Sequence, residues 1–349
     1  MDQPRNDSPI LVTGASGYLA SWIVRFLLED GYTVHGTVRD KNNPQKVKHL
    51  TEIADREKGT LRLFEADLLQ EGSFREAMSE CRWVIHTASP FKLRVKDPQE
   101  ELVAPARAGT RHVLDTVNQQ LQVERVVLTS SVAAIYGDAI ELADKASGKF
   151  TEEDWNLTSD LKHQAYAYSK TIAEKEAWAI AEAQDRWQLT TINPSFVMGP
   201  SLSDRTDGTS TDFMLSMVDG RFKSGVPELY FGIVDVRDVA MAHLRAAFND
   251  EASGRHILSN VEMSALEISG VLRTEFGKKY PLPRRVLPRW LLYLVGPFLG
   301  LSWRYVSRNV GYPIRFDNAY SMEDLGMVYR PIEETLIEQV HDFERKGFI

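Results

Sequence analysis

The sequence predicts an α/β fold, in which a doubly wound parallel sheet is followed by a smaller C-terminal lobe. The first 195 residues alternate short β-branched runs with longer helical patterns, and a glycine-rich turn joins the first run to the first helical pattern. The alternating pattern ends after Gly199-Pro200, where a polar loop begins. Alternation of this length favours right-handed crossover units, whose helices cover both faces of a parallel sheet.

Six short runs rich in valine, isoleucine, leucine and threonine are the predicted strands, at residues 10–14, 33–38, 61–67, 83–88, 125–131 and 189–194. Helical patterns separate them at 21–31, 44–57, 73–80, near 99–120 and at 159–184. Beyond residue 200 the elements are shorter, with a lone strand expected near 229–234 and a helix-rich C-terminus that contains clustered prolines.

The composition is that of a globular protein and narrows the function classes. The 349 residues carry a formal net charge of −8 and no run of lysine or arginine, which argues against a nucleic-acid partner. The single cysteine, Cys81, excludes an internal disulfide and fits a reducing cytoplasm. Because the eight histidines are at least 13 residues apart, no helical histidine pair exists, and we expect no metal site.

Two segments bear on targeting. The polar N-terminus lacks the apolar core of a signal peptide. The longest apolar stretch, 286–303, is interrupted by Arg289, Gly296 and Pro297, so it predicts a buried or pocket-lining helix pair, with a peripheral membrane role as the alternative, and no membrane span. We expect a cytoplasmic protein that is a monomer or a homodimer.

The stretch VTGASGYLA (12–20) predicts a dinucleotide-binding turn. Gly14 permits the tight turn, Gly17 lets the backbone approach a pyrophosphate, and Ala20 is a small residue at the third glycine position. We therefore expect residues 1–199 to form a Rossmann domain, to which 235–258 return. Residues 200–234 and 259–349 then form the substrate-binding lobe. The cofactor contacts expected from the turn itself are Gly14, Ser16, Gly17, Tyr18 and Leu19.

The end of the second predicted strand favours NADPH over NADH. An acidic residue usually holds the ribose 2′-hydroxyl at this place, but here Val38 is followed by Arg39. A guanidinium pairs well with a 2′-phosphate, and Lys46 of the next helix is positioned to assist. Asp40 keeps the NAD alternative open.

Together with Ser131 and Tyr166-x-x-x-Lys170, these residues resemble the extended short-chain dehydrogenase/reductase superfamily. The stretches GYTVHGTVRD, EADL, HTASP, VVLTSS, YAYSKTIAEKEAW and INPSFVMGP, within residues 10–200, resemble the branch that holds dihydroflavonol 4-reductase, cinnamoyl-CoA reductase and the yeast-type methylglyoxal and aldehyde reductases. AYAYSK lacks the asparagine, tryptophan and cysteine of the cinnamoyl-CoA signature, which disfavours that substrate.

The resemblance implies a role for each catalytic residue. Tyr166 would be the general acid for carbonyl reduction, Lys170 would bind the nicotinamide ribose and lower the pKa of the tyrosine, and Ser131 would polarise the substrate carbonyl. Ser130 is expected to pack or to bond backbone. The resemblance also implies cofactor contacts along the adenine and nicotinamide, at Asp67, Leu68, Thr87, Ala88, Ser89, Pro194, Ser195, Phe196 and Val197.

Helical spacing supports the choice of tyrosine. Residues four apart share a face of an α-helix, so Tyr166 and Lys170 can face the same site. Tyr168 is two residues from each and must point elsewhere, toward the interior or a neighbouring subunit. Ionising a free tyrosine at pH 7 costs about 4 kcal/mol, which a nearby ammonium reduces.

The substrate pocket is predicted less directly, because core packing explains its candidates equally well. They are Phe91, Ser131, Phe196, Phe213, Met214 and Tyr230, and 286–303 is expected to form the far wall. His86 and Trp178 are interpreted as core residues.

The sequence thus predicts an NADPH-dependent reductase of a ketone or aldehyde on a small, mostly apolar molecule, aromatic ones included. The alternatives are an NAD-dependent nucleotide-sugar epimerase or dehydratase and a non-catalytic NADP-sensing protein.

Overall fold

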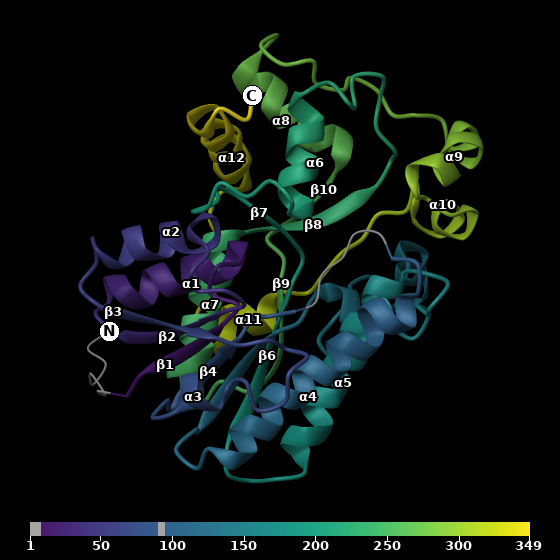
Figure 1. The fold of residues 1–349 in the computed structure, drawn as a ribbon. Coiled ribbons are helices and arrows are strands. Elements are labelled where there is room, and N and C mark those ends of the chain that lie inside the picture. Colours follow the sequence, from purple (N-terminus) through teal and green to yellow (C-terminus); the bar gives the residue numbers. More distant parts are fainter. Residues whose placement is uncertain (1–7, 90–94) are drawn as a thin grey trace.

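A computed structural model describes residues 8–89 and 95–349. Its centre is a seven-stranded parallel sheet in the order β3-β2-β1-β4-β5-β6-β9 (Figure 1). The strands are β1 (Ile10–Thr13), β2 (Thr33–Val38), β3 (Thr60–Glu65), β4 (Trp83–His86), β5 (Arg125–Thr129), β6 (Gln188–Pro194) and β9 (Gly254–Leu258). The order reverses between β1 and β4, and ligands of such sheets bind at this switch point.

Helices cover both faces of the sheet, as predicted for a doubly wound fold. One face carries α1 (Tyr18–Glu29), α2 (Pro44–Ala54) and α7 (Val236–Phe248), and the other carries α3 (Arg75–Met78), α4 (Ala104–Gln119) and α5 (Ala165–Glu182). A π-helical turn, Gln99–Val103, precedes α4. Each face has its own apolar core, so the sheet is buried on both sides.

The C-terminal lobe is built on a second, three-stranded sheet in the order β10-β8-β7. Its strands are β7 (Phe196–Met198), β8 (Tyr230–Asp235) and β10 (Val261–Ser264). The prediction of a lone strand near 229–234 is therefore wrong, since β8 pairs with β7 and with β10. Both partners are too short to carry a periodic pattern of their own.

Six further α-helices lie in the described C-terminal part of the chain. Five of them surround the lobe: α6 (Thr209–Val218), α8 (Ala265–Phe276), α12 (Ile332–Lys346) and the pair formed by α9 (Arg289–Val295) with α10 (Trp303–Asn309). The sixth, α11 (Ala319–Asp324), packs against β9. Figure 1 shows the α9–α10 pair projecting at the edge of the lobe. Within the described residues, no helix combines the length and the apolarity needed to cross a bilayer.

Candidate active site

The glycine turn between β1 and α1 is packed so tightly that two of its positions leave little space for a Cβ atom. Gly14 has φ +66°, and a Cβ there would lie 3.1 Å from the Ala88 Cα atom. A Cβ on Gly17 would lie 3.2 Å from the Gly14 carbonyl oxygen. Gly17 immediately precedes α1, so the turn directs the backbone N–H groups of a helix start toward any bound anion.

The end of β4 is fixed against this turn. The Thr13 hydroxyl accepts hydrogen bonds from the backbone N–H groups of Thr87 and Ala88, each at 3.1 Å. The Thr87 hydroxyl donates to the Thr13 carbonyl oxygen at 2.5 Å. Ser89 follows at an exposed position. The predicted cofactor residues of β1 and β4 are thus joined into one wall.

The predicted ribose and adenine residues lie after the two neighbouring strands. Arg39 is exposed directly after β2, and Lys46 is half-buried on α2. Asp67 is exposed after β3, with its carboxylate accepting a hydrogen bond from the Leu69 N–H at 2.9 Å. Leu68 is held from behind by α4, because His112 Nδ1 lies 2.8 Å from its carbonyl oxygen.

Tyr166 and Lys170 lie one turn apart near the start of α5. Tyr166 keeps 38% of its surface exposed, and desolvation by the surrounding protein raises the pKa of its phenol to about 12. The resting phenol is therefore protonated at neutral pH. Tyr168 is half-buried.

Lys170 is a buried cation. It is 9% exposed, and burial lowers the pKa of its ammonium to about 8, although the carboxylate of Glu174 opposes the shift. Among the described residues, this ammonium has no hydrogen-bond or ion-pair partner. Because its pKa is about 8, the ammonium is mostly charged at pH 7. Its N–H donors are available for a ligand.

The two adjacent serines after β5 have different partners. Ser130 is buried, and its hydroxyl donates a hydrogen bond to the Glu174 carboxylate. Ser131 begins a short 3₁₀ turn, Val132–Ala134, and its hydroxyl oxygen accepts from the Ala133 N–H at 3.1 Å. The Ser131 hydroxyl proton is thus the one available to a substrate oxygen.

A buried ion pair behind Lys170 was missed by the sequence reasoning. Glu174 Oε1 lies 2.6 Å from Arg255 Nε, and the same carboxylate accepts a hydrogen bond from Asn193 Nδ2 at 2.8 Å. The Arg255 guanidinium also lies 3.8 Å from the Trp155 ring centre. The one available signal was the four-residue spacing of Lys170 and Glu174, which places the carboxylate on the same helix face.

The segment that links β6 to β7 contains an orphaned polar atom. Pro194 ends β6, and Phe196 and Val197 begin β7. Between them Ser195 is 8% exposed, and its hydroxyl has no hydrogen-bond partner among the described residues. Burying such a group without a partner is costly, which favours a ligand at this position.

These observations fit a nicotinamide dinucleotide. The turn at Gly14 and Gly17 exposes backbone without side chains, and the buried Ser195 hydroxyl has no partner among the described residues. The Lys170 ammonium adds a positive charge with hydrogen-bond donors available for a ligand. The Tyr18 hydroxyl donates to the Gly199 carbonyl oxygen at 2.7 Å and so fixes the start of α1 against the lobe boundary.

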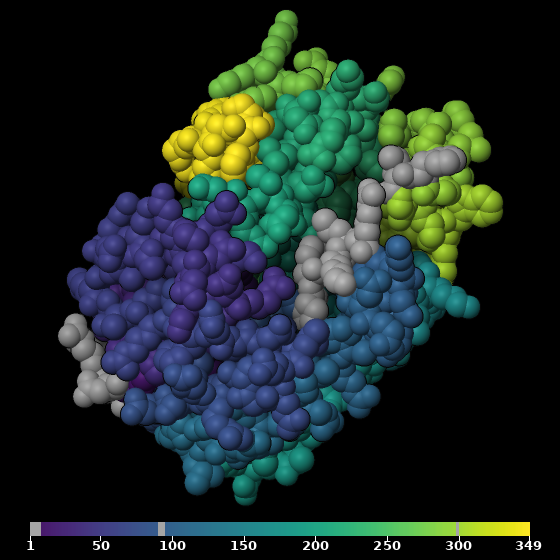
Figure 2. All heavy atoms as spheres, viewed as in Figure 1, coloured from purple at the N-terminus to yellow at the C-terminus, as the bar shows by residue number. Residues whose placement is uncertain are grey.

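The predicted substrate residues divide into two groups. Phe196 and Phe213 are half-buried, with ring centres 5.4 Å apart in an edge-on arrangement, and both pack on the lobe core. Tyr230 is half-buried beside a different cluster, and Met214 is fully buried within the lobe core. Phe91 lies outside the described residues. Figure 2 shows a hollow between the teal α6 region and the yellow-green α9–α10 region.

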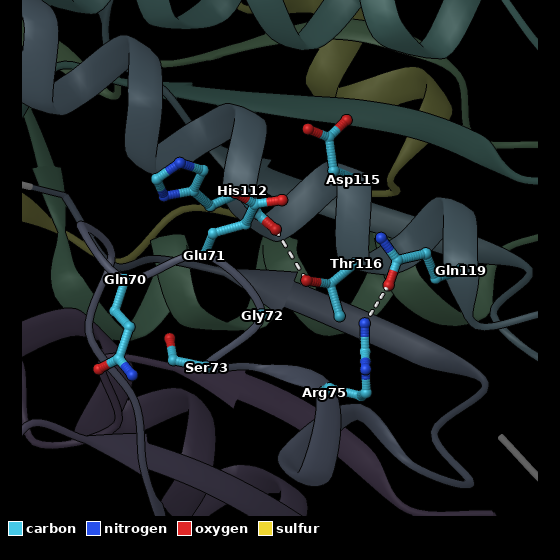
Figure 3. Close-up of a pocket in the computed structure, with 9 residues that line it drawn as sticks. All are labelled: Gln70, Glu71, Gly72, Ser73, Arg75, His112, Asp115, Thr116 and Gln119. Carbon is cyan, nitrogen blue, oxygen red and sulfur yellow. Dashed lines mark hydrogen bonds between the residues drawn. The ribbon is translucent and has the colours of Figure 1, made fainter.

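The described residues form two cavities, one beside Lys170 and one away from the predicted catalytic residues. A cavity of about 20 Å³ is lined partly by Lys170 and His86 and by three predicted cofactor residues, Leu68, Ala88 and Ser89. Burial lowers the pKa of the His86 imidazole to about 3, and Lys170 contributes in the same direction. A larger one of about 420 Å³ lies between the 70–75 segment and α4 (Figure 3). None of the predicted catalytic residues lines it.

Comparisons with known proteins agree with this geometry. The model of the NAD dependent epimerase/dehydratase family matches residues 10–259. A cinnamoyl-CoA reductase from Medicago truncatula is 39% identical over 342 residues, which cover 97% of this chain and 96% of the relative. A dihydroflavonol 4-reductase from Gerbera hybrida is 32% identical over 282 residues, covering 78% and 75%.

The structure of yeast methylglyoxal/isovaleraldehyde reductase Gre2, complexed with NADPH, covers 98% of this chain and 100% of its own, at 29% identity and a TM-score of 0.79. The resemblance expected from the motifs is confirmed. The chain belongs to the NAD dependent epimerase/dehydratase family of extended short-chain dehydrogenases/reductases, in the branch that includes cinnamoyl-CoA and dihydroflavonol reductases.

Proposed function

We propose that this protein is an NADPH-dependent carbonyl reductase that converts a ketone or aldehyde of a small, mostly apolar molecule to its alcohol. The observation that carries the proposal is the combination on α5 of a protonated phenol, Tyr166, with a buried, unpartnered ammonium, Lys170, one turn away. Relatives named as reductases support the same class.

The chain's own groups divide the remaining work. When bound, the reduced nicotinamide supplies the hydride that forms the new C–H bond. The Tyr166 phenol donates its proton to the carbonyl oxygen, and the Ser131 hydroxyl donates a hydrogen bond to the same oxygen. The Lys170 ammonium binds the ribose and stabilises the phenolate that remains. Tyr166 then regains a proton from solvent.

Cofactor choice follows from the charged groups after β2. Arg39 and Lys46 present two cations where the adenosine ribose is expected, and neither forms an ion pair among the described residues. A guanidinium binds a 2′-phosphate with paired N–H groups, and NADH has no such phosphate. NADPH is therefore the proposed cofactor. Yeast Gre2, solved with NADPH, supports this choice.

A thioester of an anionic carrier such as CoA is a second substrate class. The cinnamoyl-CoA reductases among the relatives favour it, and so does the charge of the lobe. Residues 276–316 contain eight lysines and arginines and no aspartate or glutamate, in a chain of net charge −8. The missing signature residues around Tyr166 count against it.

The test is NADPH consumption by the purified protein against aldehydes, aryl ketones, β-keto esters, flavonoid-type ketones and cinnamoyl-CoA. Tyr166→Phe serves as the matched control. We expect wild-type turnover with at least one carbonyl class and little with the variant. Equal, background rates for both proteins with every substrate would refute the proposal. Co-purification of tightly bound NAD would instead favour the epimerase alternative.

A further inference from the structure

The strongest unassigned feature is a buried carboxylate close to the catalytic helix. Asp138 is fully buried, and four side chains bond to its two oxygens. His163 Nε2 lies 2.9 Å from Oδ1, Gln164 Nε2 donates to Oδ1 at 2.8 Å, and Asn309 Nδ2 donates to Oδ1 at 2.7 Å. Arg308 Nε donates to Oδ2. We call this set the Asp138 anchor.

The anchor joins three segments that are far apart in the sequence. Asp138 follows the turn that begins at Ser131, whereas His163 and Gln164 immediately precede α5, which carries Tyr166 and Lys170. Arg308 and Asn309 form the end of α10, in the C-terminal lobe. One carboxylate therefore contacts both catalytic segments and the lobe. A carboxylate without these donors would not remain in a buried position.

Gln164 shows what the anchor does locally. Its backbone has φ 55° and ψ 51°, a left-handed conformation that is uncommon and costly for a residue with a Cβ. Its side-chain amide donates to the Gly137 carbonyl oxygen and to Asp138 Oδ1. Its carbonyl oxygen accepts the first helical hydrogen bond of α5, from the Tyr168 N–H at 3.0 Å. The conformation of Gln164 thus sets the direction in which the helix leaves the turn.

The contact with the lobe is specific. Besides bonding Asp138, Asn309 accepts a hydrogen bond from the Ala139 N–H at 2.9 Å through its Oδ1 atom. Asn309 is buried, and both its amide oxygen and its amide nitrogen are hydrogen-bonded to the 138–139 segment. A second, exposed contact joins α10 to the same region, where Arg304 Nη1 lies 3.1 Å from Asp160 Oδ2. Arg304 bonds neither Asp138 nor Gln164, although its partner Asp160 also accepts a hydrogen bond from the His163 N–H at 2.8 Å. Arg304→Met therefore removes a contact between α10 and this region while leaving every bond to Asp138 in place, and it provides a matched control.

We propose that Asp138 is a positioning residue for the reduction: it holds Gln164 in its left-handed conformation and, through Arg308 and Asn309, makes the placement of the Tyr166 phenol depend on the seating of the lobe. The proposal rests on the proposed function, in which Tyr166 donates the proton. It adds that the lobe acts on proton transfer as well as on substrate contact. Misplacement of a reacting group by about 1 Å can lower turnover on the order of 100-fold.

The experiment compares Arg308→Met, Asn309→Ala and Asp138→Asn with the control Arg304→Met. For each we measure kcat, KM for the carbonyl substrate, Kd for NADPH and the melting temperature. Arg308→Met keeps the aliphatic stem of a half-exposed residue and removes one anchor bond, so it remains informative if Asp138→Asn does not fold. We expect Arg308→Met and Asn309→Ala to lower kcat about tenfold or more. NADPH Kd should stay within about twofold, and Arg308→Lys should recover part of kcat.

Two outcomes would overturn the proposal. One is a kcat for Arg308→Met and Asn309→Ala that is no lower than for Arg304→Met. The other is a loss of kcat accompanied by an equal loss of NADPH affinity, which would indicate general disorder of the site. Wild-type turnover is measured first with Tyr166→Phe beside it. Absence of any turnover there refutes the proposed function, whereas normal turnover with unaffected anchor variants refutes only the positioning role.

Discussion

The sheet domain and the α9–α10 pair differ in how much apolar surface holds each together. Each face of the sheet has an extended cluster of buried side chains, to which α1, α4 and α7 contribute. Among the described side chains, the core of the α9–α10 pair consists of three buried apolar residues, Leu292, Val306 and Val310. The pair also exposes Trp290, Leu294 and Trp303. Since apolar stabilisation scales with buried area, local unfolding of the pair should cost less free energy than unfolding of the sheet.

This difference assigns the two regions different tasks. The cofactor wall consists of strand ends and a glycine turn, whose geometry is fixed by the sheet. The proposed far wall of the substrate site includes the less stable α9–α10 pair, which can adapt to ligands of different shape. The two regions are then expected to differ in rigidity, with the Asp138 anchor as the proposed link between them, and four predictions test this difference.

The largest effect is expected in the rigid region. Tyr166→Phe removes the proton donor and leaves the helix intact, so turnover should fall by about 10²–10⁴ while NADPH binding and melting temperature stay near wild type. Steady-state kinetics and cofactor titration measure this. Tyr168→Phe is the control and should change turnover by a small factor at most. A dead Tyr168→Phe with an active Tyr166→Phe would reverse the assignment of the acid.

Matched core truncations compare the two regions directly. Leu27 on α1 and Leu292 on α9 are both fully buried leucines, and a leucine-to-alanine change in a core typically costs about 2–5 kcal/mol. Leu27→Ala should lower the global melting temperature. Leu292→Ala should instead raise amide hydrogen exchange in 289–309 with little change in the global transition. Equal losses of global stability would show that the pair is part of the main cooperative unit.

Cofactor preference should depend on the strand end. Arg39→Asp removes the cation proposed for the 2′-phosphate and adds a repelling charge. We expect about a tenfold to hundredfold loss of NADPH affinity, with NADH affinity retained. Titration of both cofactors measures the ratio, and Arg62→Asp, on the neighbouring strand β3, controls for added negative charge. An unchanged NADPH/NADH ratio would refute the role of Arg39.

A smaller effect is expected from pH. Because burial lowers the pKa of the Lys170 ammonium to about 8, the charged form is lost in the free enzyme above that pH. The kcat/KM for reduction should be about halved at pH 8 and about tenfold lower at pH 9. Between pH 8 and 10.5 the unfolded chain binds more protons at this residue, so the free energy of unfolding should rise with pH there. Lys170→Met should abolish this rise.

Local patterns were sufficient to predict the sheet domain and the chemistry expected of it. Alternating strand and helix patterns indicated the parallel sheet, and the spacing of Tyr166 and Lys170 placed both on one helix face. These features depend on residues within a few positions of each other. Their catalytic roles stay predictions until they are measured.

Contacts between distant segments were beyond such reasoning. Arg255 bonds Glu174 from 81 residues away, and Asn309 bonds Asp138 from 171 residues away. Neither partner stands in a recognisable motif, and a buried ion pair looks in the sequence like two surface charges. The three-stranded sheet was missed for a similar reason, because β7 and β10 have three and four residues.

The position of β9 has a consequence for synthesis. This strand completes the sheet by pairing along β6, but it begins at residue 254, 60 residues after β6 ends at residue 194. At about 5–20 residues per second, the ribosome leaves the β6 edge unpaired for about 3–12 s, apart from transit through the exit tunnel. An open edge of this kind is a template for pairing with other chains. The nascent protein is therefore most exposed to aggregation and to chaperones while the segment between β6 and β9 is being made.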